Sequence, residues 1–318
     1  MRHGSKLAAA AVVFGVAVAA VTDSVETAAH PPASAPAEQT LSEAYPGLLS
    51  GALVHARPAA LPAGTVLKAG RHVVTEKDLA AEIAQAPEAV REQLGRNGLF
   101  VLEQMATSRL LLDAARAAAG KDGKDPAKAS EPELLRPYFE KLTADVTVTD
   151  DEVAEYYRKN RQMMGKATLE TVREAIKRYL LQQKRQEKVG RHVRTLGKRT
   201  AIAVSAKWAG AQAALAMDNP VDKARASGRP SLVDFGAETC RPCKMMAPIL
   251  VALRKKYADK ANVIFVSVGT EQVLAARYGV RSIPVQVFFD KAGKEVFRHV
   301  GFYGREEIEK RMAEMGAN

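Results

Sequence analysis

The only two cysteines of this 318-residue chain, Cys240 and Cys243, are separated by two residues. They follow the apolar run 231–235 and precede a stretch whose apolar residues recur at helical spacing, so they should lie at the start of a helix. Two thiols placed in this way can exchange with a disulfide. The sequence therefore indicates redox chemistry at this motif.

The position of each thiol predicts its role. Cys240 precedes the helix, where free N–H groups and the helix dipole favour negative charge, so we expect it to be the nucleophile. Arg241 adds a nearby cation that should stabilise the same thiolate. Cys243 lies one turn inside, more shielded, where it can attack a mixed disulfide. Pro242 limits the freedom of the loop and helps to hold the sulfurs within bridging distance.

A zinc half-site or a purely structural disulfide is the alternative interpretation of the cysteine pair. The chain offers no second pair of ligands, because its six histidines, at positions 3, 30, 55, 72, 192 and 299, show no metal-ligand spacing. We therefore expect no metal, and no cofactor other than a redox-active disulfide between Cys240 and Cys243.

The stretch around the motif reads as alternating strands and helices. We expect strands at 231–235, 262–268, 285–290 and 295–300, and helices at 219–227, 243–257, 271–278 and 305–315. The first two strands are joined through a helix and should pair in parallel. The last two are joined by a tight turn and should be antiparallel.

This order resembles the thioredoxin family. The resemblance covers residues 219–318 and rests on LVDFGAETCRPCKMMAPIL and YGVRSIPVQVFF. It implies that Asp234 exchanges a proton with Cys243. It also implies that Ile283 and Pro284, with a cis-proline, and Gly301 form the surface where a client backbone binds.

Two departures from the family pattern bear on this site. The usual tryptophans are replaced by Gly236 and Thr239, which makes the surface beside Cys240 less bulky. The lysine common near the buried acid is absent, and Phe265 or Val266 stands near its place. Both changes could alter client choice and proton transfer, but neither removes a group that the exchange needs.

Residues 63–205 are rich in helix-forming residues and read as a helical bundle without catalytic motifs. Within them we expect a short extended piece at 66–74, a long helix from about Pro87 to Ala119 and a short strand at 200–204. The stretches 66–79, 92–120, 148–161 and 167–189 resemble the chaperone part of SurA-like periplasmic foldases. Only a six-residue connection stands where that family carries its parvulin-type prolyl isomerase domain. The resemblance therefore implies a client-binding cradle, and we expect no prolyl isomerase activity.

The N-terminus has the composition of an export signal. A basic start is followed by an uncharged apolar run at 7–21 that ends in small residues. We expect cleavage, with an uncleaved signal anchor as the alternative; either places the protein in a periplasm, where disulfides persist. Residues 23–62 are rich in Pro, Ala and Ser and read as a flexible linker, in which 48–54 could dock.

The formal charge of +11 comes mostly from the stretch 166–207, whose basic residues are accompanied by a single aromatic residue, Tyr179. No nucleic-acid-binding module accompanies them, so a solvated helix face is favoured over a polyanion site. A basic surface toward acidic clients or lipid headgroups stays open.

These observations predict an α+β chain of two domains. Residues 1–22 are a signal peptide or anchor, 23–62 a linker, 63–205 a helical SurA-like domain, and 206–318 a thioredoxin-like domain with a mixed sheet flanked by helices. The expected function is exported protein-disulfide reduction or isomerisation on disulfide-containing or unfolded clients, supplied with electrons by a membrane donor. The alternative is a holdase chaperone in which the redox domain only docks or senses.

Overall fold

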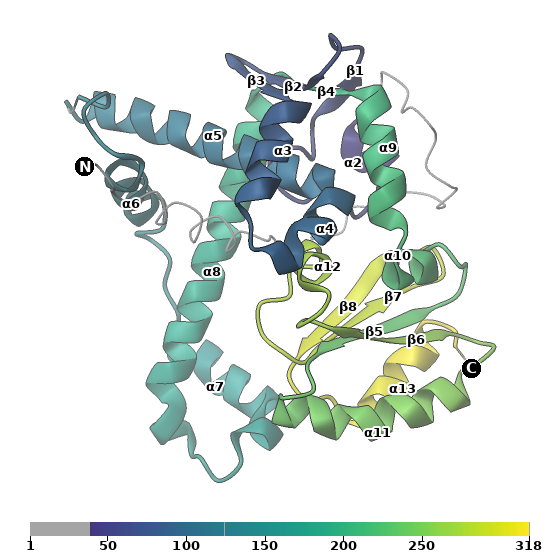
Figure 1. Cartoon of the computed structure of the whole chain (residues 1–318). Helices are drawn as coiled ribbons and strands as arrows, with labels where there is room; N and C mark the ends of the chain where they lie inside the picture. Colours follow the sequence, from purple (N-terminus) through teal and green to yellow (C-terminus); the bar gives the residue numbers. More distant parts are fainter. Residues whose placement is uncertain (1–38, 124, 318) are drawn as a thin grey trace.

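The computed structural model of the chain describes residues 39–123 and 125–317 (Figure 1). The expected signal at 1–22 and the first part of the expected linker lie outside the described residues. In the described part, the chain is organised by two four-stranded sheets. No helix of the described ranges is long and apolar enough to cross a membrane.

The first sheet joins the two ends of the helical part, where the sequence predicts a short extended piece at 66–74 and a short strand at 200–204 but not their pairing into a sheet. Its strands are β1 (Arg57–Ala59), β2 (Thr65–Ala69), β3 (His72–Thr75) and β4 (Ile202–Ser205), in the order β1-β4-β2-β3. Strand β4 pairs in parallel with β1 and antiparallel with β2. The sheet therefore brings together strands that all the intervening helices separate in the sequence.

Residues 39–62 are folded, which corrects the expected flexible linker over this range. Helix α2 (Leu41–Ala44) begins with a complete capping box. The side chains of Leu41, Tyr45 and Leu53 are fully buried in the core of the N-terminal part. Apolar residues at helical spacing after position 40 thus bury enough surface to order a segment whose composition alone suggests disorder.

A buried carboxylate holds the end of this segment. Glu103 accepts backbone N–H groups from Ser50 at 3.1 Å, Gly51 at 2.9 Å and Leu53 at 3.3 Å. Burial raises the pKa of Glu103, and the three N–H donors oppose that rise. The loop at 50–53 is therefore attached to the helix that carries Glu103.

The helices of the N-terminal part are α3 (Glu76–Gln85), α4 (Glu88–Arg96), α5 (Gly98–Lys121), α6 (Glu131–Leu142), α7 (Asp150–Lys159), α8 (Leu169–Arg199) and α9 (Ala206–Met217), with a 3-10 turn at Arg161–Met164. The sequence predicts one helix from about Pro87 to Ala119, but the structure divides it at Asn97, whose backbone is not helical. The next residue, Gly98, lies so close to α9 that an added Cβ would be 2.4 Å from Gln212 Oε1. The break lets α5 pack against α9.

The C-terminal part has the expected mixed sheet. Its strands are β5 (Ser231–Gly236), β6 (Asn262–Ser267), β7 (Val285–Phe289) and β8 (Glu295–Val300), in the order β6-β5-β7-β8. The pair β5–β6 is parallel, and the pairs β5–β7 and β7–β8 are antiparallel. The predicted pairing is confirmed, because these connections leave the strands no other direction.

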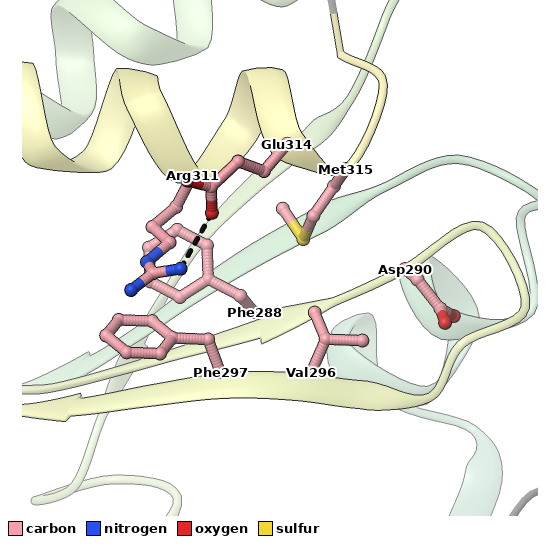
Figure 2. Close-up of a pocket in the computed structure, with 7 residues that line it drawn as sticks. All are labelled: Phe288, Asp290, Val296, Phe297, Arg311, Glu314 and Met315. Atoms are coloured by element: carbon pink, nitrogen blue, oxygen red, sulfur yellow. Dashed lines mark hydrogen bonds and ion pairs between the residues drawn. The ribbon is translucent and has the colours of Figure 1, made fainter.

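Helices cover both faces of this sheet (Figure 1). Helices α11 (Arg241–Lys256) and α13 (Arg305–Glu314) pack on one face, and α10 (Pro220–Arg225) and α12 (Gln272–Arg277) on the other. Figure 2 shows Arg311 of α13 above the Phe297 ring, 4.2 Å from its centroid, with its charge paired to Glu314. The hollow of about 190 Å³ beside this pair is lined by neither cysteine.

The two parts are joined through α4 and α12. The Gln93 side chain donates to the carbonyl of Thr270 at 2.6 Å and accepts the backbone N–H of Val273 at 3.1 Å. Val273 itself packs into the core of the N-terminal part. Buried Arg277 donates to Asn97 Oδ1 at 3.3 Å, so polar and apolar contacts together fix the sheet domain against the helices.

Candidate active site

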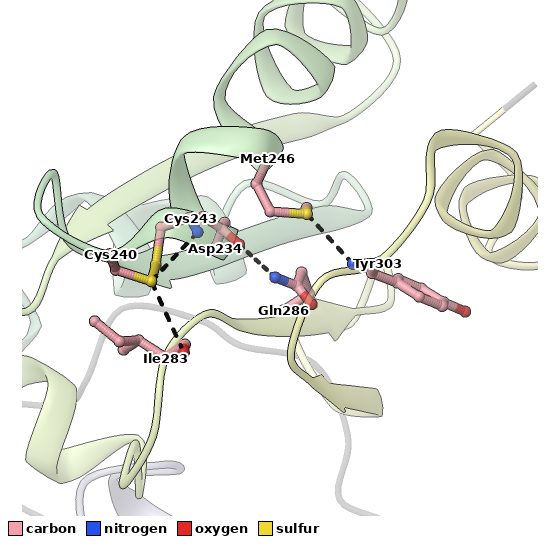
Figure 3. Close-up of a disulfide and its surroundings, with 7 residues drawn as sticks. All are labelled: Asp234, Cys240, Cys243, Met246, Ile283, Gln286 and Tyr303. Atoms are coloured by element: carbon pink, nitrogen blue, oxygen red, sulfur yellow. Dashed lines mark hydrogen bonds between the residues drawn. A yellow bond between two sulfur atoms is a disulfide. The ribbon is translucent and has the colours of Figure 1, made fainter. Parts of the chain in front are cut away.

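The two cysteines lie at the start of α11, as the sequence predicts. Cys240 occupies the N-cap position and Cys243 the first turn, with their Cα atoms 5.2 Å apart and their sulfurs bonded as a disulfide. Cys240 is half-buried, whereas Cys243 is 4% exposed. Cys240 is thus the more exposed of the two cysteines, and Figure 3 shows the disulfide that joins them.

The surroundings of Cys240 favour a thiolate in the reduced state. The backbone N–H of Cys243 points at Cys240 Sγ, 3.3 Å away, as one of the free N–H groups of the first helical turn. Arg241 is exposed beside it, with Pro242 next in the first turn. Donors and positive charge at a helix N-terminus stabilise negative charge, which suits a nucleophilic sulfur.

The loop before β7 faces Cys240. The carbonyl oxygen of Ile283 lies 4.0 Å from Cys240 Sγ, and the Ile283–Pro284 peptide bond is cis. Gly301 donates its N–H to the Pro284 carbonyl at 2.8 Å and has a φ of 109°, which a residue with a Cβ rarely adopts. The structure therefore brings Ile283, Pro284 and Gly301 together next to the reactive sulfur.

Asp234 is fully buried on β5, on the sheet face that α11 covers. Loss of solvent raises the pKa of its carboxyl to about 6, although a hydrogen bond from Gln286 opposes the rise. Its neighbour on the same face, Gly236, lies so close to α11 that an added Cβ would be 3.4 Å from Cys243 Sγ. A carboxyl that titrates near neutral pH thus lies under the first turn of the helix.

The two departures from the family pattern also lie at this place. Phe265 is directly in register with Asp234 on β6, so an aromatic ring, 39% exposed, stands where the lysine is expected. The same ring lies 3.0 Å from where a Cβ of Gly236 would be. Phe265 thus fills the space beside Gly236. Thr239, the residue before Cys240, is exposed.

Two residues of the site lie outside the set expected from the sequence. Gln286 donates from Nε2 to Asp234 Oδ1 at 2.6 Å, and Arg281 is hydrogen-bonded to Gln186 of α8. The sequence signal for Gln286 is a lone carboxamide inside the apolar strand Val285–Phe289, where an unpaired polar group would be costly. For Arg281 the sequence holds no comparable signal, since its partner lies in another domain.

The described residues contain no cluster of three or more His, Cys, Asp or Glu side chains that could hold a metal ion.

Comparison with known proteins points to the same region. The thioredoxin family model matches residues 214–314. The chain is 36% identical over 87 residues to the thioredoxin of Alicyclobacillus acidocaldarius subsp. acidocaldarius, covering 27% of this chain and 82% of that protein. It is 43% identical over 77 residues to a thioredoxin of Staphylococcus aureus, covering 24% and 73%. Among solved structures, the thioredoxin of Fasciola hepatica is 34% identical, covers 28% of this chain and 82% of its own, and gives a TM-score of 0.26.

Proposed function

Because the chain belongs to the thioredoxin family, we propose that its C-terminal domain catalyses thiol–disulfide exchange on protein clients. The observation that carries this proposal is the Cys240–Cys243 disulfide at the start of α11, next to the Ile283 carbonyl. A client backbone alongside Ile283, Pro284 and Gly301 would bring its own sulfur to Cys240.

The exchange follows two steps. The Cys240 thiolate attacks one sulfur of a client disulfide; the new S–S bond forms as the client bond breaks, and the other client sulfur leaves as a thiolate. Cys243 then passes its proton to Asp234, and its sulfur attacks Cys240, which restores the protein disulfide and releases the second client sulfur. Two electrons pass from the protein to the client in each cycle.

We assign the direction as reduction or isomerisation of client disulfides. A thioredoxin-like dithiol has a reduction potential of about −270 mV, whereas strong oxidants of this fold lie near −120 mV. The potential of the Cys240–Cys243 pair, measured against glutathione or a reference dithiol, should fall near the lower value. A potential near the higher value would make the protein an oxidant.

We also propose that the protein works in a periplasm and receives electrons from a membrane donor. The support for export is the basic and apolar composition of residues 1–22, together with a dithiol that needs an electron source in an oxidising compartment. Fractionation of cells that make the tagged full chain should place it in the periplasmic or inner-membrane fraction. A cytoplasmic fraction would reject export.

We propose that the helical part binds a segment of the client. A hollow of about 730 Å³ lies among α5, α6 and α8. Its apolar lining consists of Leu111, Leu135, Phe139, Leu181 and Val189, and its charged lining of Arg136, Arg178, Arg185 and Glu140. This size and lining suit a segment with both apolar and acidic side chains.

The hollow reaches the redox domain through Gln186. This residue lines the hollow and is hydrogen-bonded to Arg281, two positions before Ile283. We therefore propose that the hollow holds an extended client segment while the cysteine of the client is at Cys240. The SurA-like origin of residues 63–205 stays a prediction, and the client-binding role does not depend on it.

Charge reversal tests this binding site. Arg185→Glu should weaken binding of an unfolded, alkylated acidic protein about fivefold at low salt, because it replaces an attraction by a repulsion. Lys177→Glu, an exposed change of the same charge on α8 that does not line the hollow, serves as the control. Equal effects of the two variants in fluorescence anisotropy would reject the hollow as the site.

Turnover tests the exchange activity and separates it from the holdase alternative. The full chain should catalyse reduction of an interchain protein disulfide by a small dithiol, and Cys240→Ser should abolish it. If the wild-type protein shows no such turnover, and Cys240→Ser suppresses client aggregation as well as the wild type does, the holdase alternative is correct.

A further inference from the structure

Gln286 is a buried polar residue that the exchange steps above do not use. Its register places it directly opposite Asp234 of β5 and directly opposite His299 of β8. Residues opposite each other on antiparallel strands point to the same face, so the three side chains form a row beneath α11. Gln286 and Asp234 are both fully buried.

Hydrogen bonding within this pair is one-sided. Gln286 Nε2 donates to Asp234 Oδ1 at 2.6 Å, as the dashed line in Figure 3 shows. Within the described part of the chain, Asp234 Oδ2 and Gln286 Oε1 are buried without a hydrogen-bond partner. One carboxyl oxygen is therefore engaged, and the other is available for a proton.

The carboxamide of Gln286 and burial shift the pKa of Asp234 in opposite directions. Burial disfavours the charged carboxylate and is the larger effect, so the pKa of Asp234 is raised to about 6. An N–H group aimed at Oδ1 stabilises the charged form and lowers that pKa. Without this donor, Asp234 would stay protonated to a higher pH and accept a proton less readily near neutrality.

We propose that Gln286 is the positioning residue for proton transfer by Asp234: it holds Oδ1, so that Oδ2 exchanges the proton of Cys243. The inference rests on the proposed exchange activity. In the resolving step the proton of Cys243 passes to Asp234 Oδ2, the sulfur forms its bond to Cys240, and the client sulfur departs with the electrons of the broken bond. The proton later leaves Oδ2 for solvent, which resets the carboxylate.

Few other titratable groups face this pair. From β8 the facing group is His299, whose pKa burial lowers from its ordinary value. From α11 the group is Cys243 itself, and from β6 the residue in register with Asp234 is the uncharged Phe265. A change in titration on altering Gln286 would therefore report on the carboxamide.

The test is the pH dependence of Asp234 in the full-length protein. Gln286→Leu should move the midpoint of the Asp234 carboxyl carbon in NMR upward by about one pH unit, the size of one hydrogen bond to a charged group. The rate of the resolving step should fall about fivefold at pH 6 and stay nearly unchanged at pH 8. The reason is that the higher pKa lowers the ionised fraction of Asp234 about fivefold at pH 6 and only slightly at pH 8. Val287→Ala, whose side chain lies on the other sheet face, should change stability without moving the midpoint.

A measurement on the wild type keeps the test decisive if Gln286→Leu does not fold. The side-chain amide signals of Gln286 should titrate with the midpoint of Asp234. Separate midpoints, or a midpoint that Gln286→Leu leaves in place or moves downward, would overturn the role of Gln286. If the protein shows no turnover at any pH, the exchange activity is rejected instead. The titration of the Gln286 side-chain amide can still be measured in that case.

Discussion

Asp234 links the redox chemistry to the stability of the fold. It is a fully buried carboxyl, and among the described residues its partner is a single carboxamide rather than a charged group. A protein tolerates such a group only at a cost, because removing an ionised carboxyl from water is unfavourable. That cost has a definite pH dependence, which can be measured apart from any activity.

The folded-state pKa of Asp234 is raised above its unfolded value, from 3.8 to about 6. Its neutral form is therefore favoured in the folded protein, and stability is lost as pH rises from about 4 through 6. The loss amounts to about 3 kcal/mol and is complete above that range. Asp234→Asn should thus raise the free energy of unfolding at pH 8 by up to this amount and much less at pH 4. A difference from the wild type in urea unfolding that is the same at both pH values would contradict this account.

Arg241 acts on Cys240 through charge alone, because its side chain is exposed. Arg241→Glu should slow alkylation of Cys240 at neutral pH several-fold, since it replaces a stabilising cation next to the thiolate by an anion. Lys244→Glu, an exposed change one turn further along α11, should have a smaller effect. Equal rates for both variants and the wild type would mean that the helix N–H groups alone stabilise the thiolate.

At the scale of elements, the composition of the chain does not predict the contact between α8 and the segment 39–56, which precedes β1. Gly197 of α8 lies against the backbone of this segment, and an added Cβ would be 2.1 Å from the carbonyl oxygen of Ala52. Neither of these backbones can move away as a flexible side chain could. The absence of a side chain at position 197 therefore allows the segment to pack.

Gly197→Ala should destabilise the N-terminal part by about 3 kcal/mol, because the methyl group forces the two backbones apart. Residues 39–56 should then be cleaved faster in limited proteolysis. Gly120→Ala in α5, where an added Cβ meets nothing, is the matched control and should leave cleavage unchanged. If Gly197→Ala is cleaved no faster than the control, the close contact is not a constraint.

At the scale of the whole molecule, the redox domain is held in one orientation to the helices. Gln93 bonds both the carbonyl of Thr270 and the N–H of Val273, and Arg277 bridges Asn97 and the buried Asp222. This orientation places the loop at Arg281 against α8, where Arg281 is hydrogen-bonded to Gln186 of the hollow.

Gln93→Ala should loosen this junction, because it removes two hydrogen bonds, each with a net contribution of about 1 kcal/mol. Amide hydrogens of α12 should exchange faster in the variant. Gln85→Ala removes a glutamine that bonds only within its own helix and is the matched control. Unchanged exchange in α12 would show that the apolar contact of Val273 holds the domains by itself.

The sequence predicts the C-terminal fold well, because each of its signals is local. The apolar runs, the proline before β7 and the tight turn between β7 and β8 fix strand directions without knowledge of distant contacts. The motif also predicts where Cys240, Cys243 and Asp234 lie. The pairing of Gln286 with Asp234 is not predicted, because it depends on the register between β5 and β7. The sequence of an apolar run does not show that register.

The N-terminal part is predicted less completely, because its contacts are long-range. Strand β4 pairs with β1 and β2 across the whole helical region, so a periodicity argument detects the strand but not the sheet. The ordering of residues 39–56 depends on Glu103 and Gly197, which are distant in sequence. The sequence of residues 39–56 does not identify these two partners.

Trapping of a mixed disulfide tests the central claim most directly. The reduced full-length Cys243→Ser protein, incubated with a disulfide-bonded unfolded protein, should accumulate a covalent adduct through Cys240, because the resolving sulfur is gone. The adduct should disappear on reduction, and Cys240→Ser should form none. An adduct through Cys243 in Cys240→Ser, or no adduct in either variant, would contradict the account.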